Sequence, residues 1–281
     1  MFQINWRLKS LIYWFLYFIF FKKILFFIQK KITNRAYSSL GVMLYAYKLH
    51  YNSLKKYKSK KILEFGAGKS LEQNIYLTFK FNNRINQTVI DIDKMIDFNL
   101  LNLAKNQLQK KIKLSFKSKY IINLEDLKNI LNIKYYAPIN IIDLNEKEKF
   151  DAIISTNVIE HISKKNFEII LEKFIKIVKN EGILSFLIDY SDHYSHTDRN
   201  IVSTNFLKYS ELEFKKYNTP LLFQNRLRHY DYINIFKKKK FKILKIIKGP
   251  KGNRPNIVST EFRKNHKDVF VTWGYFLLKK I

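Results

Sequence analysis

The chain has 281 residues, 47% of them hydrophobic, which is enough for one large domain with a full core. It contains no cysteine, so disulfides and thiolate metal sites are excluded, in agreement with a cytosolic protein. The net charge of +29 comes from 52 Lys and Arg against 23 Asp and Glu, and such a surface favours anionic partners.

The N-terminal region is both basic and strongly apolar. Residues 1–63 contain 13 Lys and Arg and no acidic residue. Residues 11–21 are eleven consecutive apolar residues, followed by Lys22 and Lys23. Eleven helical residues reach roughly 16 Å, about half the thickness of the hydrocarbon layer. A longer span would bury the two lysines at about 3 kcal/mol each.

We therefore expect residues 1–35 to form a helix that lies in the membrane interface, with Trp6 and Trp14 at headgroup depth. A secretory signal is not expected, because no cleavage site of small residues follows. The alternative is a helix that packs on the protein's own core. The expected location is the cytoplasm, including the inner face of the cell membrane.

From residue 61 onwards, short apolar strands alternate with helices. The expected strands are 61–65, 88–91, 133–136, 151–155 and 183–188. The expected helices are 38–57, 71–81, 95–110, 124–131 and 163–179. This alternation predicts an α/β fold with a Rossmann-like, doubly wound and mostly parallel sheet. Ligands of such a sheet bind at the carboxyl ends of its strands.

The rhythm of strands and helices stops after the fifth strand. Residues 189–235 are polar and aromatic, and we interpret them as an insertion that covers the substrate. Apolar runs return within residues 241–281, at 241–247 and 270–278, and are expected to form a closing pair of strands.

The most informative motif ends the first strand. Residues 61–70 read KILEFGAGKS, so a strand ends in an acid, Glu64, followed by a Gly-x-Gly turn. The turn lets backbone N–H groups approach a ligand closely. Leucines at positions 63 and 71 exclude a phosphate-binding P-loop and a dinucleotide fingerprint. An acid before the turn suits a cation, which favours a nucleoside that carries an ammonium group, as S-adenosylmethionine does.

Further motifs follow at consistent spacing. Asp91 ends the second strand, some 27 residues after Glu64, where an acid accepts both ribose hydroxyls of a nucleoside. Residues 150–162, FDAIISTNVIEHI, cover the fourth strand and the turn after it, and Gly182 precedes the fifth strand.

Together these motifs resemble the class I S-adenosylmethionine-dependent methyltransferases (methyltransferase type 11-like) over roughly residues 60–190. The resemblance implies a methyltransferase domain at 36–281 with a cofactor core at 60–190. It implies that Glu64 and the glycine turn hold the methionine end of S-adenosylmethionine, that Asp91 holds the ribose, and that the residues after the fourth strand line the sulfonium side. The cofactor-binding residues it implies are Glu64, Gly66, Ala67, Gly68, Asp91, Ile92, Asn140, Thr156 and Asn157. Asn140 stands where the family often has an acid beside the adenine.

The C-terminal part carries a narrower resemblance. Residues 205–210 and 224–229, with Tyr232, are similar to the substrate segment of methyltransferases encoded with bacterial surface-polysaccharide genes. This implies O-methylation of a sugar or glycan precursor. The alternatives are a lipid or quinone methyltransferase and a non-catalytic methyltransferase-like scaffold. A nucleic-acid acceptor is not expected, because residues 155–158 lack the Asn/Asp-Pro-Pro-aromatic motif of amino-methylating enzymes.

A sugar hydroxyl needs a base before it attacks a methyl group at neutral pH. We predict His193 as that base, oriented by Asp192, with His161 as the second candidate. The alternative function of this loop is a metal site, although no zinc-type spacing is present. That site would consist of Asp189, Asp192, His193 and His196.

Three basic residues in the predicted cover are candidates for binding an anionic acceptor. These are Arg226, Arg228 and His229. The alternative is a solvated basic face without a ligand.

Overall fold

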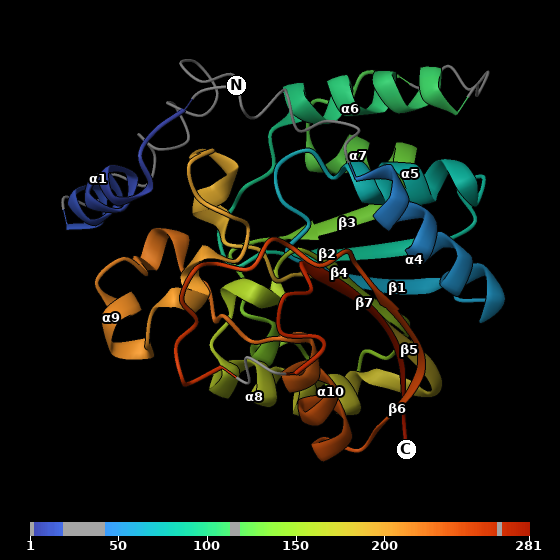
Figure 1. Cartoon of the computed structure of the whole chain (residues 1–281). Coiled ribbons are helices and arrows are strands. Elements are labelled where there is room, and N and C mark those ends of the chain that lie inside the picture. The colour runs from blue at the N-terminus through green and yellow to red at the C-terminus, as the bar shows by residue number, and fades with distance from the viewer. Residues whose placement is uncertain (1–2, 19–42, 113–118, 263–265) are drawn as a thin grey trace.

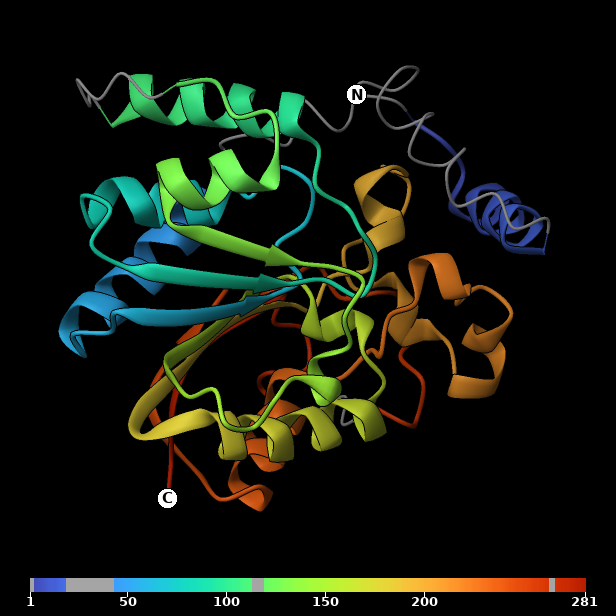
Figure 2. The ribbon, with the colours of Figure 1, turned by 180° about the vertical axis from the view of Figure 1, so that it is seen from behind.

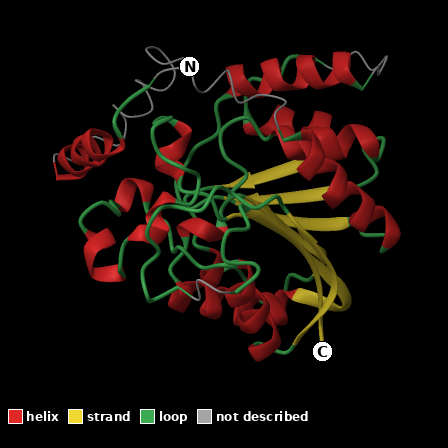
Figure 3. Ribbon diagram, in the orientation of Figure 1, coloured by secondary structure: helices red, strands yellow, loops and turns green. Residues whose placement is uncertain are grey.

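The computed structural model describes residues 3–18, 43–112, 119–262 and 266–281. A seven-stranded sheet of order β3-β2-β1-β4-β5-β7-β6 forms its centre (Figure 3). Its strands are β1 (Lys61–Phe65), β2 (Asn86–Ile90), β3 (Ile133–Tyr136), β4 (Phe150–Thr156), β5 (Val178–Asp189), β6 (Phe241–Lys248) and β7 (Trp273–Lys280). The first five strands are parallel, and β7 is antiparallel to both β5 and β6. The prediction of an α/β, Rossmann-like and mostly parallel sheet is confirmed.

Helices cover both faces of this sheet (Figure 1). One face carries α4 (Leu44–Lys56), α5 (Glu72–Lys80), α6 (Phe98–Lys111) and α7 (Leu124–Leu131). The other face carries α8 (Lys164–Ile177) and α10 (His229–Lys238). Successive strand residues point to opposite faces, so Ile62 joins the core beneath α5 and Leu63 joins the core beneath α8. Strands buried on both faces explain why the sequence showed short apolar runs.

Most expected elements agree with the structure within three residues, but β5 does not. It begins at Val178, five residues before the expected start, so that Gly182 lies inside the strand. The pairing of β5 with β4 shifts register between Phe150 and Ala152. A Cβ at Gly182 would come within 2.6 Å of the Val178 side chain and 2.9 Å of the Asp151 carbonyl. Glycine is therefore needed there for close approach of two strands.

The parallel pairing brings three strand ends to one edge. Phe65 of β1 pairs with Ile90 of β2, and Glu64 pairs with Ile154 of β4. In Figure 2 the arrows of β1, β2 and β3 all point toward the segment that follows β5. The residues directly after β1, β2 and β4 must therefore lie close together.

The segment after β5 forms short helices rather than strands. They are η4 (His193–His196), η5 (Asn205–Lys208), α9 (Glu211–Lys215) and η6 (Pro220–Leu222). They surround a small apolar core of their own, whose members include Tyr194, Phe206 and Phe214. We call residues 190–228 the cover.

Helix α1 (Trp6–Phe18) packs on the cover through one side chain above all, Trp6. The indole is 5% exposed and lies against the rings of Tyr194, Tyr209 and Tyr217, with centroids 4.6 to 5.8 Å apart. The backbone N–H of Trp6 donates to Asp198 Oδ2 at 2.9 Å. The expectation that Trp6 lies at headgroup depth is therefore wrong.

Trp14 also contacts the protein, because its Nε1–H donates to the Lys216 carbonyl at 2.7 Å. Residues 19–35 of the predicted interface helix, and the start of the helix expected from residue 38, lie outside the described residues. Among the residues that the structure describes, no helix is both long enough and apolar enough to cross a membrane.

We predict that Trp6→Ala lowers the free energy of unfolding by about 3 kcal/mol, since a buried indole is replaced by a cavity. Leu11→Ala is the matched control, because Leu11 lies on the same helix and is 66% exposed. Thermal melting compares the two variants with the natural chain. Equal melting temperatures for both would contradict the anchoring role of Trp6.

Candidate active site at the carboxyl edge of the sheet

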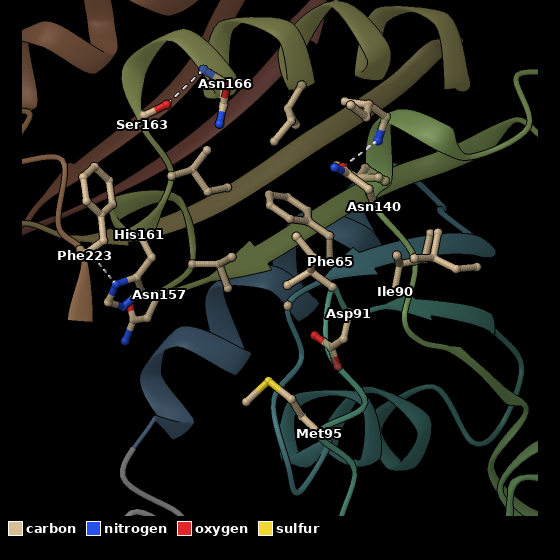
Figure 4. Close-up of a pocket in the computed structure, with 18 of the residues that line it drawn as sticks. Phe65, Ile90, Asp91, Met95, Asn140, Asn157, His161, Ser163, Asn166 and Phe223 are labelled. Carbon is tan, nitrogen blue, oxygen red and sulfur yellow. Dashed lines mark hydrogen bonds between the residues drawn. The ribbon is translucent and has the colours of Figure 1, made fainter. Parts of the chain in front are cut away.

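A cavity of about 840 Å³ opens where β1, β2 and β4 end (Figure 4). Its wall is mostly apolar, with contributions from Phe65, Ile90 and Met95. Polar groups come from the strand ends and from the start of α8. These are Asp91, Asn140, Asn157, His161, Ser163 and Asn166. The cover closes one side with Asn218, Pro220 and Phe223, which the sequence analysis did not single out.

The glycine turn after β1 forms the floor of this cavity. Gly66 and Gly68 both have positive φ, +76° and +73°, a conformation that other residues adopt only with strain. A Cβ at Gly66 would also lie 2.5 Å from the Val158 side chain. A Cβ at Gly68 would meet nothing within 4 Å, so its backbone is open to a ligand. The expected close approach of the turn is therefore available.

Asp91 is the acid that faces the cavity. Its side chain is buried, and Oδ2 has no hydrogen-bond partner among the described residues. Burial raises the pKa of Asp91 to about 6, although the Tyr135 hydroxyl and the N–H groups of Gly68 and Ala67 oppose this shift. An acceptor oxygen left free at the end of β2 fits the ribose hydroxyls that the sequence assigned to it.

Glu64 does not line the cavity, contrary to expectation. Its two oxygens accept hydrogen bonds from the side chains of Gln73 (2.8 Å) and Asn74 (2.7 Å) at the start of α5. Burial raises the pKa of Glu64 to about 8. The prediction that Glu64 faces the ammonium group of a ligand is therefore wrong for this arrangement, and Glu64 instead supports the glycine turn from behind.

Thr156 also lies behind the cavity wall. Its hydroxyl donates to Gln73 Oε1 at 2.7 Å and lies 2.9 Å from His50 Nε2. The other nitrogen of His50 lies 2.8 Å from Ser185 Oγ. Burial lowers the pKa of His50 to about 3, so the ring is neutral. Gln73, Thr156 and His50 thus connect Glu64 to Ser185 in the centre of the sheet. No sequence motif indicated His50 or Gln73.

Asn157 and Asn140 do line the cavity. Asn157 has φ +54°, and its buried Oδ1 has no partner among the described residues. A strained residue with a free acceptor at a strand end is typical of a ligand site. Asn140 caps the short helix η2 (Ile141–Asp143) by accepting from the Ile142 N–H at 3.2 Å. Ile92, 69% exposed, borders the cavity beside them.

The predicted catalytic residues are only partly brought together. His161 lines the cavity, and its Nδ1 lies 2.7 Å from the Phe223 carbonyl (Figure 4). His193 lies behind it, with ring centroids 4.9 Å apart. Asp192 does not orient His193, because its oxygens accept from the Tyr194 N–H and from Asn205. That part of the prediction is wrong.

The carboxylate beside His193 is Asp189, whose Oδ2 lies 3.3 Å from His193 Nε2 and 4.0 Å from His196 Nε2. The four-residue metal site considered from the sequence is therefore incomplete. Its fourth member, Asp192, is turned into the cover and is fully buried.

The three basic residues assigned to an anionic acceptor do not reach the cavity. Arg226 is held between the rings of Phe214 and Phe262 and pairs with Glu211 at 2.6 Å. His229 is 1% exposed and stacks on Phe276. The prediction of an anion site at these residues is wrong, because each is committed to internal contacts.

Arg228 is fully buried and joins three parts of the chain. Its guanidinium donates to the carbonyls of Val269 (2.8 Å), Tyr190 (2.7 Å) and Val271 (2.6 Å). Burial lowers its pKa to about 10, so it remains charged at neutral pH. Arg228 therefore ties the start of the cover to the segment before β7.

No family model matches the sequence, and no curated protein sequence matches it. Solved structures do match. The 1,6-didemethyltoxoflavin-N1-methyltransferase of Burkholderia thailandensis, solved with its substrate and S-adenosylhomocysteine, is 10% identical. The match covers 91% of this chain and 85% of that one, with a TM-score of 0.50. This chain has the methyltransferase fold.

A second match is an S-adenosylmethionine-dependent methyltransferase of Clostridium acetobutylicum. It is 13% identical and covers 92% of this chain and 98% of that one, with a TM-score of 0.48. A third is the N-methyltransferase NodS of Bradyrhizobium japonicum in complex with S-adenosylhomocysteine. It is 12% identical and covers 84% and 86% of the two chains, with a TM-score of 0.44.

We predict that Arg228→Ala lowers the free energy of unfolding by about 3 kcal/mol or more, because three buried carbonyls lose their donor. Lys208→Ala in the same cover is the control for loss of a positive charge. Chemical denaturation measures both. If Arg228→Ala instead unfolds like the natural chain and has a raised KM for an anionic acceptor, Arg228 binds the acceptor after all.

Proposed function

We propose that this protein is an S-adenosylmethionine-dependent methyltransferase. The observation that carries the proposal is Asp91, which lines the cavity beside the open glycine turn and has one carboxylate oxygen without a partner among the described residues. Relatives in fold were solved with S-adenosylhomocysteine. On this proposal the ribose lies at Asp91, the adenine lies near Asn140 and Ile92, and the methionine end lies along Gly66, Ala67 and Gly68.

We further propose that the acceptor is a hydroxyl of a sugar or glycan precursor. The end of the cavity toward the cover offers uncharged polar groups, among them Ser163, Asn166 and Asn218. Amides and hydroxyls suit the many donors and acceptors of a sugar. His161 and His193, at the same end, are the groups available to activate the hydroxyl.

Methyl transfer at this site is an in-line displacement. The acceptor oxygen forms a bond to the methyl carbon as the bond between carbon and sulfur breaks, and the proton of the hydroxyl leaves. The protein has to hold the oxygen near the methyl group and exclude water. Val158 and His161 line the cavity together with Phe223 of the cover, and the alignment would occur beside them.

Calorimetric titration of the full chain with S-adenosylmethionine tests the proposal. We expect one site, and we expect Asp91→Asn to weaken it roughly 10- to 100-fold, the value of hydrogen bonds to a charged group. Asp143→Asn is the control, since Asp143 is exposed beside the cavity without lining it. No heat with the natural chain would favour a non-catalytic scaffold.

Affinity for S-adenosylmethionine should depend on pH through Asp91. Only the ionised carboxylate accepts from both ribose hydroxyls, and its pKa in the empty site is about 6. Affinity should therefore be full above that value and fall, by at most about tenfold per pH unit, as pH drops below it. The Asp91→Asn variant should lose this dependence. An unchanged slope in the variant would assign the titration to another group.

We also propose that α1 lies against an anionic membrane surface. Its outward residues Leu8, Leu11, Phe15 and Phe18 are 51% to 69% exposed and recur at helical spacing. Its inward side is fixed to the cover by Trp6. Lipid or quinone acceptors would be within reach of such a surface, and an acceptor screen separates them from glycans.

Co-sedimentation with anionic vesicles tests this contact. We expect the pair of substitutions Leu11→Asn and Phe15→Asn to abolish most vesicle binding, because it removes the apolar stripe without changing the charge. Leu212→Asn is the control, since Leu212 is an 81% exposed leucine on α9. If all three proteins bind vesicles equally, the contact lies elsewhere. If none binds and the natural chain is dimeric, α1 covers a second copy instead.

A further inference from the structure

Glu160 is a buried acid that has no basic partner among the described residues. It lies in the short helix η3 (Ile159–His161) directly after β4 and is 2% exposed. No side chain of the described residues donates a hydrogen bond to either carboxylate oxygen, and only the backbone N–H groups of Glu160 and Asp189 act on them. A buried carboxylate is either protonated or stabilised by a cation, hydrogen-bond donors or a metal ion.

His161, the next residue, is held in the orientation of a metal ligand. A carbonyl oxygen can only accept, so the contact of 2.7 Å to the Phe223 carbonyl places the ring proton on Nδ1. The lone pair of the neutral ring is then on Nε2. Histidine ligands typically donate their other ring N–H to a carbonyl or carboxylate in this way.

His193 completes the group from a distant part of the sequence. Its Nε2 is buried without a hydrogen bond in the described chain, although Asp189 Oδ2 is only 3.3 Å away. The parallel pairing of β4 with β5 brings the two strand ends together, which places His193 beside His161. One ligand atom each from Glu160, His161 and His193 lies within 4.8 Å of the others.

We propose that Glu160, His161 and His193 bind a divalent transition-metal ion at the end of the cavity near the cover. Two imidazoles and one carboxylate are a ligand set for ions such as Zn²⁺, Mn²⁺ and Fe²⁺. Three protein ligands leave further coordination positions open, as in catalytic rather than structural sites. Asp189 adds a second negative charge near the site, with its Oδ2 3.3 Å from His193 Nε2.

The role of this ion rests on the proposed function. Of the three ligands His161 lines the cavity, so an ion held there would be within reach of an acceptor in the cavity. A sugar hydroxyl bound there loses its proton to water more easily, because the ion stabilises the alkoxide. The alkoxide oxygen then takes the methyl group, the sulfonium becomes a neutral thioether, and the methyl ether leaves the ion. On this account His161 and His193 would activate the hydroxyl by holding the ion rather than as general bases.

Metal binding can be measured without activity. The full chain, prepared without a histidine tag, is treated with chelator, dialysed and titrated with Co²⁺ and with Zn²⁺ by calorimetry. We expect one site per chain. Glu160→Gln keeps the size of the side chain and should weaken binding by more than about tenfold, the loss that even an outer-shell partner can cause. His193→Gln should do the same.

His266→Gln is the matched control, because it removes an imidazole from another surface of the described chain. It should leave metal affinity unchanged. The metal-free Glu160→Gln protein should melt at the same or a higher temperature than the natural chain, since a buried unpaired acid is removed. If Glu160→Gln does not fold, His193→Gln decides the matter alone.

Two results would overturn the site: no binding of either ion, or binding that Glu160→Gln and His193→Gln leave intact. Titration of the same samples with S-adenosylmethionine separates this outcome from failure of the proposed function. Metal binding without cofactor binding would refute the methyltransferase and keep the metal site. Cofactor binding without metal binding would refute the metal site and leave the proposed methyltransferase function standing.

Discussion

The parallel register of β2, β1 and β4 is the constraint on which the rest of the molecule depends. Because Phe65 pairs with Ile90 and Glu64 pairs with Ile154, the three strands end at the same edge of the sheet. Gly66, Asp91 and Asn157 follow these ends and meet around one cavity. A shift of one residue in any pair would send the corresponding side chain to the opposite face of the sheet. Burial of apolar residues on both faces prevents such a shift.

The features that sequence analysis located well are those fixed by local backbone conformation. The Gly-x-Gly turn needs positive φ at Gly66 and Gly68, and Asp91 follows a strand that is buried on both faces. Each of these requirements acts within a few residues, so the sequence carries it directly. The same is true of α7 and β3, whose bounds agree with the expected ones because Asn132 ends the helix in a left-handed conformation.

The features that it missed depend on packing between distant segments. A run with Arg226, Arg228 and His229 looks like a basic surface, and nothing in its composition reveals that each side chain is enclosed. Glu64 precedes the glycine turn as expected, yet the side chains at the start of α5 take up its oxygens. Glu160 and His161 were visible in the motif after β4, but their relation to His193 exists only through the pairing of two strands.

The docking of α1 has a mechanical consequence. This helix packs on η4 and η6, and the segment around η6 supplies Asn218, Pro220 and Phe223 to the cavity wall. The phenylalanine carbonyl in turn holds the imidazole of His161. A displacement of α1 would thus be transmitted first to the end of the cavity that His161 and Phe223 line. If a contact at α1 changes the affinity of this end of the cavity for a ligand, thermodynamic reciprocity requires that the ligand change the affinity of α1 for its contact by the same factor.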